Sequence, residues 1–415
     1  MSIFAARKKL LLSINFISMN ILSDRILNLE ESQTIAMARK SRELSDSGVD
    51  VISLSLGEPD FDTPEFIKEA AKKAIDDNYS HYTPVPGLGE LRNAISKKFK
   101  RDNNLDYAAD EIVASTGAKQ TLSQLLMTIV NPGDEVIVPA PYWVSYYQMV
   151  KMAEGTPIVI EATVDADFKV SAAQVEEAIT SKTKAFLFST PCNPTGSVYS
   201  REELAELVKV FEKHPEIMII SDEIYEHINF LGEHVSIGQF DSIKERVITV
   251  NGVSKGFAMT GWRVGYLGGP KWLAAACTKM QGQTTSATCS IAQKATEAAV
   301  SEDPSFTEDM RAAFLRRRDL MISKLQEIDG LKLSIPQGAF YIFPDVSSYF
   351  GKSYDGTTVA NANDFCMYLL NEANVATVTG EAFGSPNCIR ISYAAADEKL
   401  LEAAERIKSA LEKLA

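Results

Sequence analysis

Short apolar runs alternate with amphipathic stretches between about residues 110 and 270. The apolar runs are rich in β-branched residues and read EIVAS (111–115), DEVIVPA (134–140), TPIVIEA (156–162), TKAFLFS (183–189), IMIISDE (217–223), RVITVN (246–251) and RVGYLGG (263–269). Between several of them, apolar residues recur every three or four positions, in TLSQLLMTIV (121–130), SAAQVEEAI (171–179) and REELAELVKVFEK (201–213). Such strands alternating with helices are typical of βαβ units around a buried, mainly parallel sheet. The pattern therefore predicts a large α/β domain.

The pattern changes after about residue 300. A long charged helix is predicted over 304–328, followed by a hairpin-like strand pair within 330–346, another helix, a strand at NCIRISYA (387–394) and a terminal helix over 396–414. This order indicates a smaller α/β domain. We predict boundaries of 61–305 for the large domain and 306–415 for the small one, which residues 19–60 join from the other end of the chain.

The first residues do not fit the pattern of a folded domain. Arg7, Lys8 and Lys9 precede the apolar run LLLSINFISM (10–19), which resembles a secretory signal but has no small-x-small cleavage site. The run is also too short and too interrupted to span a bilayer. We therefore expect Met19 to be the true start and residues 1–18 to be an upstream extension.

Composition narrows the classes of function. The 415 residues carry a net charge of −13, which disfavours a nucleic-acid partner or an anionic membrane surface. The five cysteines form no CxxC pair, and the four histidines form no HExxH motif, so neither a metal site nor a disulfide framework is predicted. Scattered free cysteines favour a reducing, cytoplasmic setting.

Polar residues that could bind a ligand or take part in catalysis follow four of the predicted strands. Gly117, Ala118 and Lys119 lie in a turn that runs into a helix, where backbone N–H groups can bind an anion. Asn193 and Asp222 end two other strands, at the edge where α/β sheets place their ligands. A carboxylate at the end of an apolar strand is costly unless it is paired or hydrogen-bonded.

The fourth strand is followed by Lys255, with Arg263 eight residues further on. A lysine in such a loop can be an ordinary solvated residue, and each of the other signals has an equally plain structural explanation. In a desolvated, cation-bearing site, however, the pKa of Lys255 would fall and its amine would become a nucleophile. Arg263 offers a planar donor fork suited to a phosphate. The convergence of these residues on one sheet edge favours a catalytic site.

The motifs STPCNPTG (189–196), SDEIYEH (221–227), SKGFAMTGWRVGY (254–266) and NCIRISYA resemble those of the class I/II aminotransferases of pyridoxal-phosphate (PLP) fold type I. The resemblance runs from about residue 20 to the end of the chain. Within that family, YTPVPG (82–87), PYWVSY (141–146) and AMTGWR (258–263) are similar to the bacterial subgroup of aspartate aminotransferases. The resemblance implies a large domain with a mainly parallel seven-stranded sheet between helices, and a smaller α/β domain.

The resemblance also implies roles for residues around the cofactor ring. Lys255 would form the Schiff base with PLP and then shuttle a proton, while Asp222 would pair with the pyridine nitrogen and make the ring an electron sink. Asn193 and Tyr225 would hydrogen-bond the 3′ oxygen, and Trp143 would stack on the ring unless it is simply a core aromatic.

The phosphate is expected on the backbone of the turn at Gly117, Ala118 and Lys119, with Arg263 beside it. Tyr82 matches a tyrosine that reaches the phosphate from a neighbouring subunit, which implies a homodimer with active sites at its interface. The chain departs from many relatives in having Gly252 where they carry a serine, which puts one phosphate hydrogen bond in doubt; Ser254 is adjacent to the lysine instead.

Substrate recognition is implied at both ends of an amino acid. Arg390 matches the arginine that clamps the α-carboxylate, and Gly57 matches a glycine whose backbone approaches the same group. In the bacterial subgroup, the lysine matching Lys119 recognises a distal carboxylate, with Ser32, Gln33 and Thr34 expected near the entrance. Relatives that use prephenate typically carry a lysine near the position of Glu30, so the acid here argues against prephenate.

We therefore predict an aspartate:2-oxoglutarate aminotransferase that works by a ping-pong cycle and acts on amino acids and 2-oxo acids. The alternatives are an aminotransferase for aromatic amino acids, alanine or prephenate, or a PLP-dependent C–S lyase on the same scaffold. A PLP-binding transcription regulator is a third hypothesis, but it requires a helix-turn-helix domain, and the acidic chain disfavours it.

Overall fold

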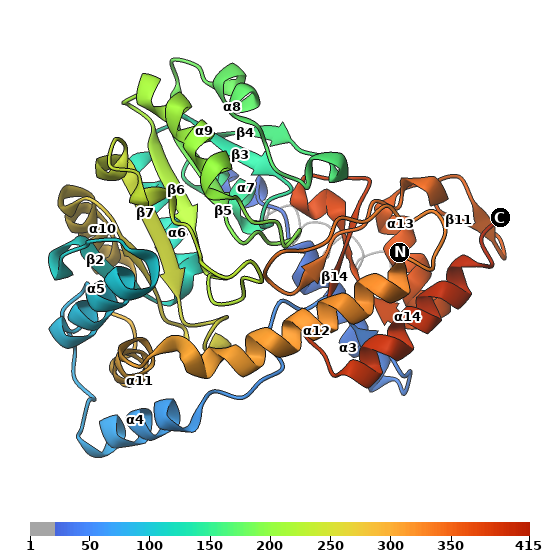
Figure 1. The fold of residues 1–415 in the computed structure, drawn as a ribbon, viewed down its shortest axis with the longest axis horizontal. Coiled ribbons are helices and arrows are strands. Elements are labelled where there is room, and N and C mark those ends of the chain that lie inside the picture. The colour runs from blue at the N-terminus through green and yellow to red at the C-terminus, as the bar shows by residue number, and fades with distance from the viewer. Residues whose placement is uncertain (1–20) are drawn as a thin grey trace, which may run out of the picture.

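The computed structural model describes residues 21–415, so the prediction for residues 1–18 lies outside the described residues. A seven-stranded sheet in the order β2-β8-β7-β6-β5-β3-β4 forms the centre of the molecule (Figure 1). Its strands are β2 (Ile112–Ser115), β3 (Glu135–Ala140), β4 (Thr156–Glu161), β5 (Thr183–Ser189), β6 (Met218–Asp222), β7 (Val247–Gly252) and β8 (Gly265–Gly268). All neighbours pair in parallel except β8, which is antiparallel to both β2 and β7. Every strand predicted from the apolar runs is present.

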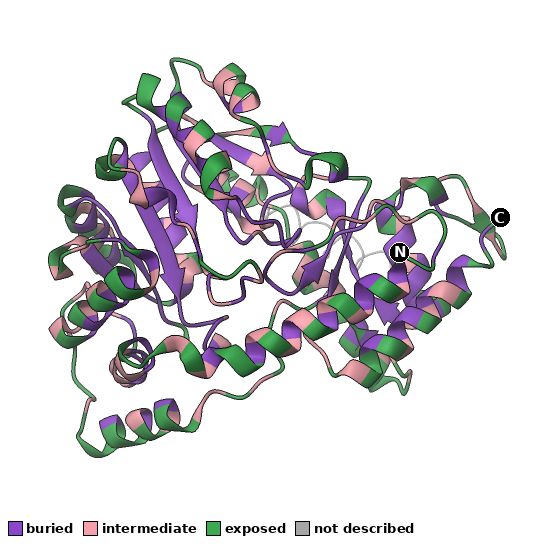
Figure 2. Ribbon diagram, viewed as in Figure 1, coloured by how far each residue is buried: buried purple, intermediate pink, exposed green. Residues whose placement is uncertain are grey.

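Helices cover both faces of this sheet because its strands are apolar on both sides. In β5, Leu187 packs with α6 (Gly117–Ile129), α7 (Ser145–Met152) and α10 (Lys271–Thr284) on one face. Phe186 and Phe188 point to the other face and pack with α9 (Arg201–Lys213). Figure 2 shows the buried strands between helices whose outer faces are exposed.

The remaining helices of this part are α4 (Glu65–Asp76), α5 (Gly89–Asn103), α8 (Ala172–Ala178) and α11 (Ser290–Ser301). Helices α8 and α9 begin at predictable places, because Ser171 with Gln174 and Ser200 with Glu203 form capping boxes. Each pair satisfies backbone N–H groups that the first helical turn would otherwise leave without acceptors.

The long helix α12 (Glu308–Leu325) runs from α11 to the C-terminal part of the chain (Figure 1). There, β13 (Val378–Thr379), β14 (Ile389–Ser392) and β9 (Tyr341–Ile342) form a small antiparallel sheet. The other elements are β10 (Ser353–Tyr354), β11 (Thr357–Thr358), α13 (Ala362–Tyr368) and α14 (Asp397–Leu411). The N-terminal elements α2 (Asp24–Leu27), α3 (Gln33–Asp46) and β1 (Ile52–Ser53) precede the large sheet in the chain, and β1 pairs with β12 (Val375–Ala376). The domain boundaries at residues 60 and 305 stay a prediction.

The hairpin predicted within 330–346 forms only as an isolated antiparallel bridge between Lys332 and Asp345. Pro336 has no N–H to donate, and the amide of Gln337 donates to the carbonyl of Gly196 at 2.8 Å instead. Tyr341 pairs with Ser392 of β14 rather than within a hairpin. This arrangement brings Tyr341 beside the strand that carries Arg390. No helix among residues 21–415 is long and apolar enough to cross a membrane.

Candidate active site

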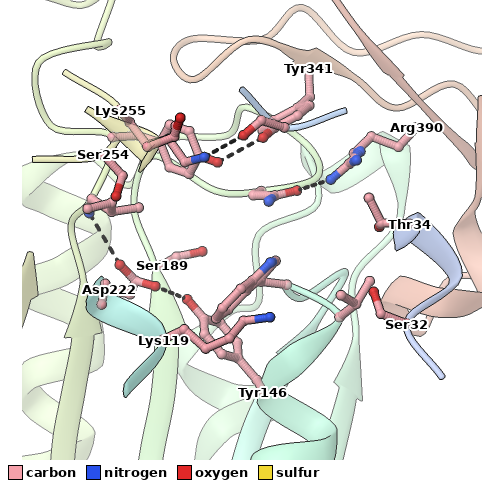
Figure 3. Close-up of a pocket in the computed structure, with 18 of the residues that line it drawn as sticks. Ser32, Thr34, Lys119, Tyr146, Ser189, Asp222, Ser254, Lys255, Tyr341 and Arg390 are labelled. Carbon is pink, nitrogen blue, oxygen red and sulfur yellow. Dashed lines mark hydrogen bonds between the residues drawn. The ribbon is translucent and has the colours of Figure 1, made fainter. Parts of the chain in front are cut away.

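A cavity of about 260 Å³ lies where the carboxyl ends of β5, β6 and β7 meet the first turn of α6 and the strand β14. The residues predicted for the site line this cavity, with the exceptions of Gly117 and Tyr82; they are Gly57, Ala118, Lys119, Trp143, Asn193, Asp222, Tyr225, Lys255, Arg263 and Arg390. Figure 3 shows how the labelled side chains from these separate elements point into one space. The structure therefore brings together residues that are up to 333 positions apart in the chain, from Gly57 to Arg390 (390 minus 57).

Lys255 follows β7 and is partly buried against the N-terminal segment. Its ammonium donates a hydrogen bond to the carbonyl oxygen of Gly57. Burial lowers the pKa of Lys255 to about 8, and the nearby Arg390 guanidinium contributes, although the carboxylate of Glu58 opposes the shift. An amine with such a pKa is neutral in a substantial fraction of molecules near physiological pH, which is what a nucleophilic lysine requires.

Asp222 ends β6 and is only 4% exposed. Its carboxylate accepts hydrogen bonds from the Tyr146 hydroxyl at 2.6 Å and from the Ile224 amide at 3.2 Å. Burial raises the pKa of Asp222 to about 6, although both hydrogen bonds lower it. A buried carboxyl poised in this way would gain from a cation placed beside it, such as a protonated ring nitrogen.

Arg390, on β14, is a buried cation with 2% exposure and no ion-pair partner among the residues described. Its Nη1 donates to Asn193 Oδ1 at 3.0 Å, the bond drawn at Arg390 in Figure 3. Its Nη2 donates to the Ser55 carbonyl at 2.6 Å. The Nε atom has no hydrogen-bond partner in the described part of the chain. Because a buried charge without a counterion is costly, this guanidinium indicates a site for an anionic ligand.

A second cationic region surrounds the start of α6. Gly117 has φ of +80° and packs so closely on the Arg263 guanidinium that a Cβ would collide with it. Gly265 of β8 is needed for a similar reason, because its Cβ would collide with the Ala118 amide nitrogen. The free N–H groups of the first helical turn and the Arg263 side chain therefore lie together, as a phosphate site requires.

Lys119 lies beside this region, with Nζ 5.0 Å from the centroid of the Trp143 ring. Its side chain is accessible to solvent in part, yet burial lowers its pKa and the Arg263 charge adds to the effect. Ser32 and Thr34 also line the cavity (Figure 3), whereas Gln33 does not. The hydroxyl of Thr34 has no hydrogen-bond partner among the described residues.

Tyr82 and Gly252 are the two positions at which the site needs separate comment. Tyr82 is fully exposed and lies in another hollow with His81 and Ser290, so this chain does not bring it to its own cavity. Its contact with a neighbouring subunit stays a prediction. Gly252 has no room for the serine that many relatives carry, because a Cβ there would lie 2.9 Å from Gly265 Cα; Ser254 lines the cavity instead.

Several lining residues were missed by the sequence reasoning. Tyr146 donates to Asp222, Ser189 places a buried hydroxyl without a partner among the described residues, and Tyr341 contacts Tyr225. Tyr146 lies in the PYWVSY motif and Ser189 opens STPCNPTG, so both stood next to residues that were singled out. Nothing in the sequence around Tyr341 distinguishes it from an ordinary core aromatic.

A buried ionic cluster lies behind the segment that carries Asp222 and Tyr225. Glu223, Glu226 and His234 offer ligand atoms within 4.8 Å of one another, but the ammonium of Lys98 contacts Glu226 and supplies positive charge there. Burial alone would raise the pKa of Glu226, and Lys98 instead holds it well below its usual range. The cluster therefore anchors this segment as an ion-pair network.

A nucleophilic lysine, a buried carboxyl and two separate cationic regions around one cavity define an enzyme active site at the edge of an α/β sheet. The model of the family "Aminotransferase class I and II" matches residues 49–407. The chain belongs to this family, which confirms the predicted resemblance and fold class and makes the protein an aminotransferase.

Individual relatives cover almost the whole chain. An aspartate/prephenate aminotransferase from Cereibacter sphaeroides is 48% identical over 94% of this chain and 98% of its own length. A bifunctional aspartate aminotransferase and glutamate/aspartate-prephenate aminotransferase from Petunia hybrida is 45% identical over 94% of this chain and 82% of its own. The solved aspartate aminotransferase from Rhizobium meliloti has a TM-score of 0.92 and 42% identity, covering 95% of this chain and 99% of that one.

Proposed function

We propose that this aminotransferase uses pyridoxal phosphate and transfers the amino group of aspartate to 2-oxoglutarate. The observation that carries the proposal is the pair of cationic groups on the cavity, Arg390 and Lys119, neither of which forms an ion pair with the residues described. A dicarboxylic amino acid has two carboxylates to match them. The buried Arg390 suits the α-carboxylate through its planar fork, and Lys119 suits the distal carboxylate as a point charge.

The chain's own residues fit the cofactor. The start of α6 with Arg263 offers a phosphate site, and Asp222 offers a buried carboxylate for the ring nitrogen. Asn193 uses its carbonyl oxygen toward Arg390, which leaves its amide N–H groups, with the Tyr225 hydroxyl, for the ring oxygen. When bound, the cofactor supplies the electron sink that makes the substrate α-hydrogen acidic.

Lys255 has the properties of both an anchor and a proton carrier. Its amine borders the cavity, and its lowered pKa of about 8 lets it gain or lose a proton near neutral pH. Arg390 and Asn193, on the cavity wall, would hold the substrate α-carboxylate while Lys255 moves the α-proton. Trp143, whose ring lies beside Lys119, would cover the cofactor and exclude water.

Prephenate is a second candidate amino acceptor, because relatives from Cereibacter and Petunia carry it in their names. Burial raises the pKa of Tyr142, the residue before Trp143, and the negative charges of Tyr147 and of the exposed Glu30 add to the shift. The Glu30 charge would repel a second carboxylate there. We therefore predict that Glu30 disfavours prephenate, although the names of these two relatives include it.

The test is a panel of amino donors with 2-oxoglutarate, ranked by kcat/KM, with prephenate as an alternative acceptor for aspartate. We expect aspartate to exceed alanine and phenylalanine by at least tenfold, and prephenate to be a poor acceptor. The Lys255→Ala protein, which should be inactive with every pair, is the control. A preference for alanine or an aromatic donor would contradict the proposed substrate.

We also propose that the active protein is a homodimer in which Tyr82 reaches the neighbouring site. Its full exposure in a single chain is what a contact across subunits requires. Sedimentation should give twice the chain mass, and Tyr82→Phe should weaken cofactor binding without changing that mass. Cofactor affinity equal to wild type would exclude this role. The cysteines are all free thiols, and the cytoplasmic setting stays a prediction.

A further inference from the structure

Tyr341 borders the cavity and contacts Arg390, Tyr225 and Gly57. It lies on β9, beside Arg390 on the neighbouring strand β14, because Tyr341 pairs with Ser392. Its side chain is completely buried. The residue thus has contacts with both the carboxylate-binding arginine and the residues expected around the cofactor ring.

The first contact is with the guanidinium. The Arg390 Cζ atom lies 4.6 Å from the centroid of the Tyr341 ring and 5.0 Å from that of Phe383. Aromatic faces attract a guanidinium and restrict the orientation of its plane. A fixed plane matters because a carboxylate is bound by two parallel N–H donors, and a rotated fork would offer only one of them.

The second contact is made by the hydroxyl. The Tyr341 and Tyr225 hydroxyl oxygens are 2.8 Å apart, so one of them donates to the other (Figure 3). The same hydroxyl packs on Gly57, where a Cβ would lie only 2.5 Å from it. The Tyr341 hydroxyl therefore contacts both the Tyr225 hydroxyl and the N-terminal segment at Gly57.

We propose that Tyr341 is a positioning residue whose ring orients the Arg390 guanidinium and whose hydroxyl orients that of Tyr225; this rests on the proposed function. Each phenol has a single proton. When Tyr225 donates its proton to the negatively charged ring oxygen of the cofactor, Tyr341 must be the donor in the bond that the two hydroxyls share. A hydroxyl that accepts a hydrogen bond becomes a stronger donor itself.

The hydroxyl contact has a measurable consequence. With the cofactor bound, negative charge on its ring oxygen would favour a proton on the nitrogen that Lys255 contributes. A stronger donor at Tyr225 neutralises part of that charge and lowers the pH at which the nitrogen loses its proton. Removing the Tyr341 hydroxyl should therefore raise this pH, which visible absorbance of the substrate-free, cofactor-loaded enzyme reports directly.

The experiment compares Tyr341→Phe, Tyr341→Leu, Tyr225→Phe and the double Phe variant in two assays. The first is the midpoint of the absorbance change with pH, and the second is the dissociation constant of maleate, a dicarboxylate that cannot react. Tyr341→Phe should raise the midpoint by about half to one pH unit and leave maleate binding within about twofold. Tyr341→Leu, which also removes the ring, should weaken maleate binding by about 3- to 30-fold.

The double variant tests whether Tyr341 acts through Tyr225. If it does, Tyr341→Phe adds no further shift once Tyr225 is already phenylalanine. Tyr368→Phe is the matched control, because Tyr368 is also buried and donates to the Ala410 carbonyl at 2.7 Å, outside the cavity. Its midpoint should equal that of wild type.

An unchanged midpoint in Tyr341→Phe, or shifts that add in the double variant, would overturn the role of the hydroxyl. Equal maleate affinity in the Phe and Leu variants would overturn the role of the ring. Failure of the proposed function would look different: the wild-type protein itself would show no visible band with pyridoxal phosphate, or no reaction with aspartate.

Discussion

Replacing Lys119 with alanine tests whether this side chain selects dicarboxylic substrates. The ammonium borders the cavity, lies 5.0 Å from the Trp143 ring centroid and has no ion-pair partner among the described residues. A hydrogen bond between charged groups contributes about 1.5–3 kcal/mol, and we take the lower half of this range because Lys119 is accessible to solvent. At about 1.4 kcal/mol for each factor of ten, kcat/KM for aspartate should fall roughly 10- to 50-fold.

Alanine, which has no distal carboxylate, should lose no more than about twofold, so the measured quantity is the ratio of the two kcat/KM values. Lys119→Arg keeps the charge and should restore part of the ratio. Lys271→Ala removes an exposed lysine that pairs with Asp110 at the surface, and it should leave the ratio unchanged. Equal losses with aspartate and alanine in Lys119→Ala would refute the reasoning.

Three further predictions concern the charges around the cavity and the buried ionic cluster of Lys98 and Glu226. Burial lowers the pKa of Lys255 to about 8 from an ordinary 10.5. Uptake of pyridoxal phosphate by cofactor-free protein should therefore accelerate as pH rises through about 8. A midpoint near 10.5 would contradict the desolvation of this lysine. The hydrogen bond from the Tyr146 hydroxyl lowers the pKa of Asp222. Tyr146→Phe should therefore move the acidic limb of the kcat/KM profile to higher pH and reduce activity at neutral pH about tenfold or more. An unchanged profile would exclude the hydrogen bond from this role. Lys98→Met removes the lysine that contacts the buried Glu226 carboxylate, and it should cost about 3–5 kcal/mol of unfolding free energy in denaturant titrations. Adding Glu226→Gln should recover much of this loss, and equal instability of the single and double variants would contradict the ion-pair account.

The large sheet was predictable because its strands are buried on both faces and therefore read as continuous apolar runs. The Ser200 and Glu203 pair likewise marks the start of α9 in the sequence alone. The antiparallel direction of β8 was not predictable, since the direction of a strand leaves no trace in its apolar pattern. The hairpin predicted within 330–346 was wrong because the Gln337 amide donates to the Gly196 carbonyl and the Gln337 carbonyl accepts from the Phe230 amide, each more than a hundred residues away.

The site likewise contains some residues that the sequence reveals and others that only the fold reveals. Lys255, Asp222 and Asn193 are recognisable because polar residues at the ends of apolar strands need a reason to be there. Tyr146 and Tyr341 have no such signal, since a buried tyrosine is an ordinary core residue until its hydroxyl partner is known. Those partners, Asp222 and Tyr225, are 76 and 116 positions away, and only the fold brings them into contact.

The most direct test of the account is to locate the cofactor on the chain. Protein loaded with pyridoxal phosphate should be reduced with borohydride, digested and mapped by mass spectrometry, with Lys255→Ala treated in parallel. We predict that the pyridoxyl group is found on the peptide containing Lys255 and that the variant carries none. A pyridoxyl group on another lysine, or equal labelling of the Lys255→Ala protein, would contradict the central claim.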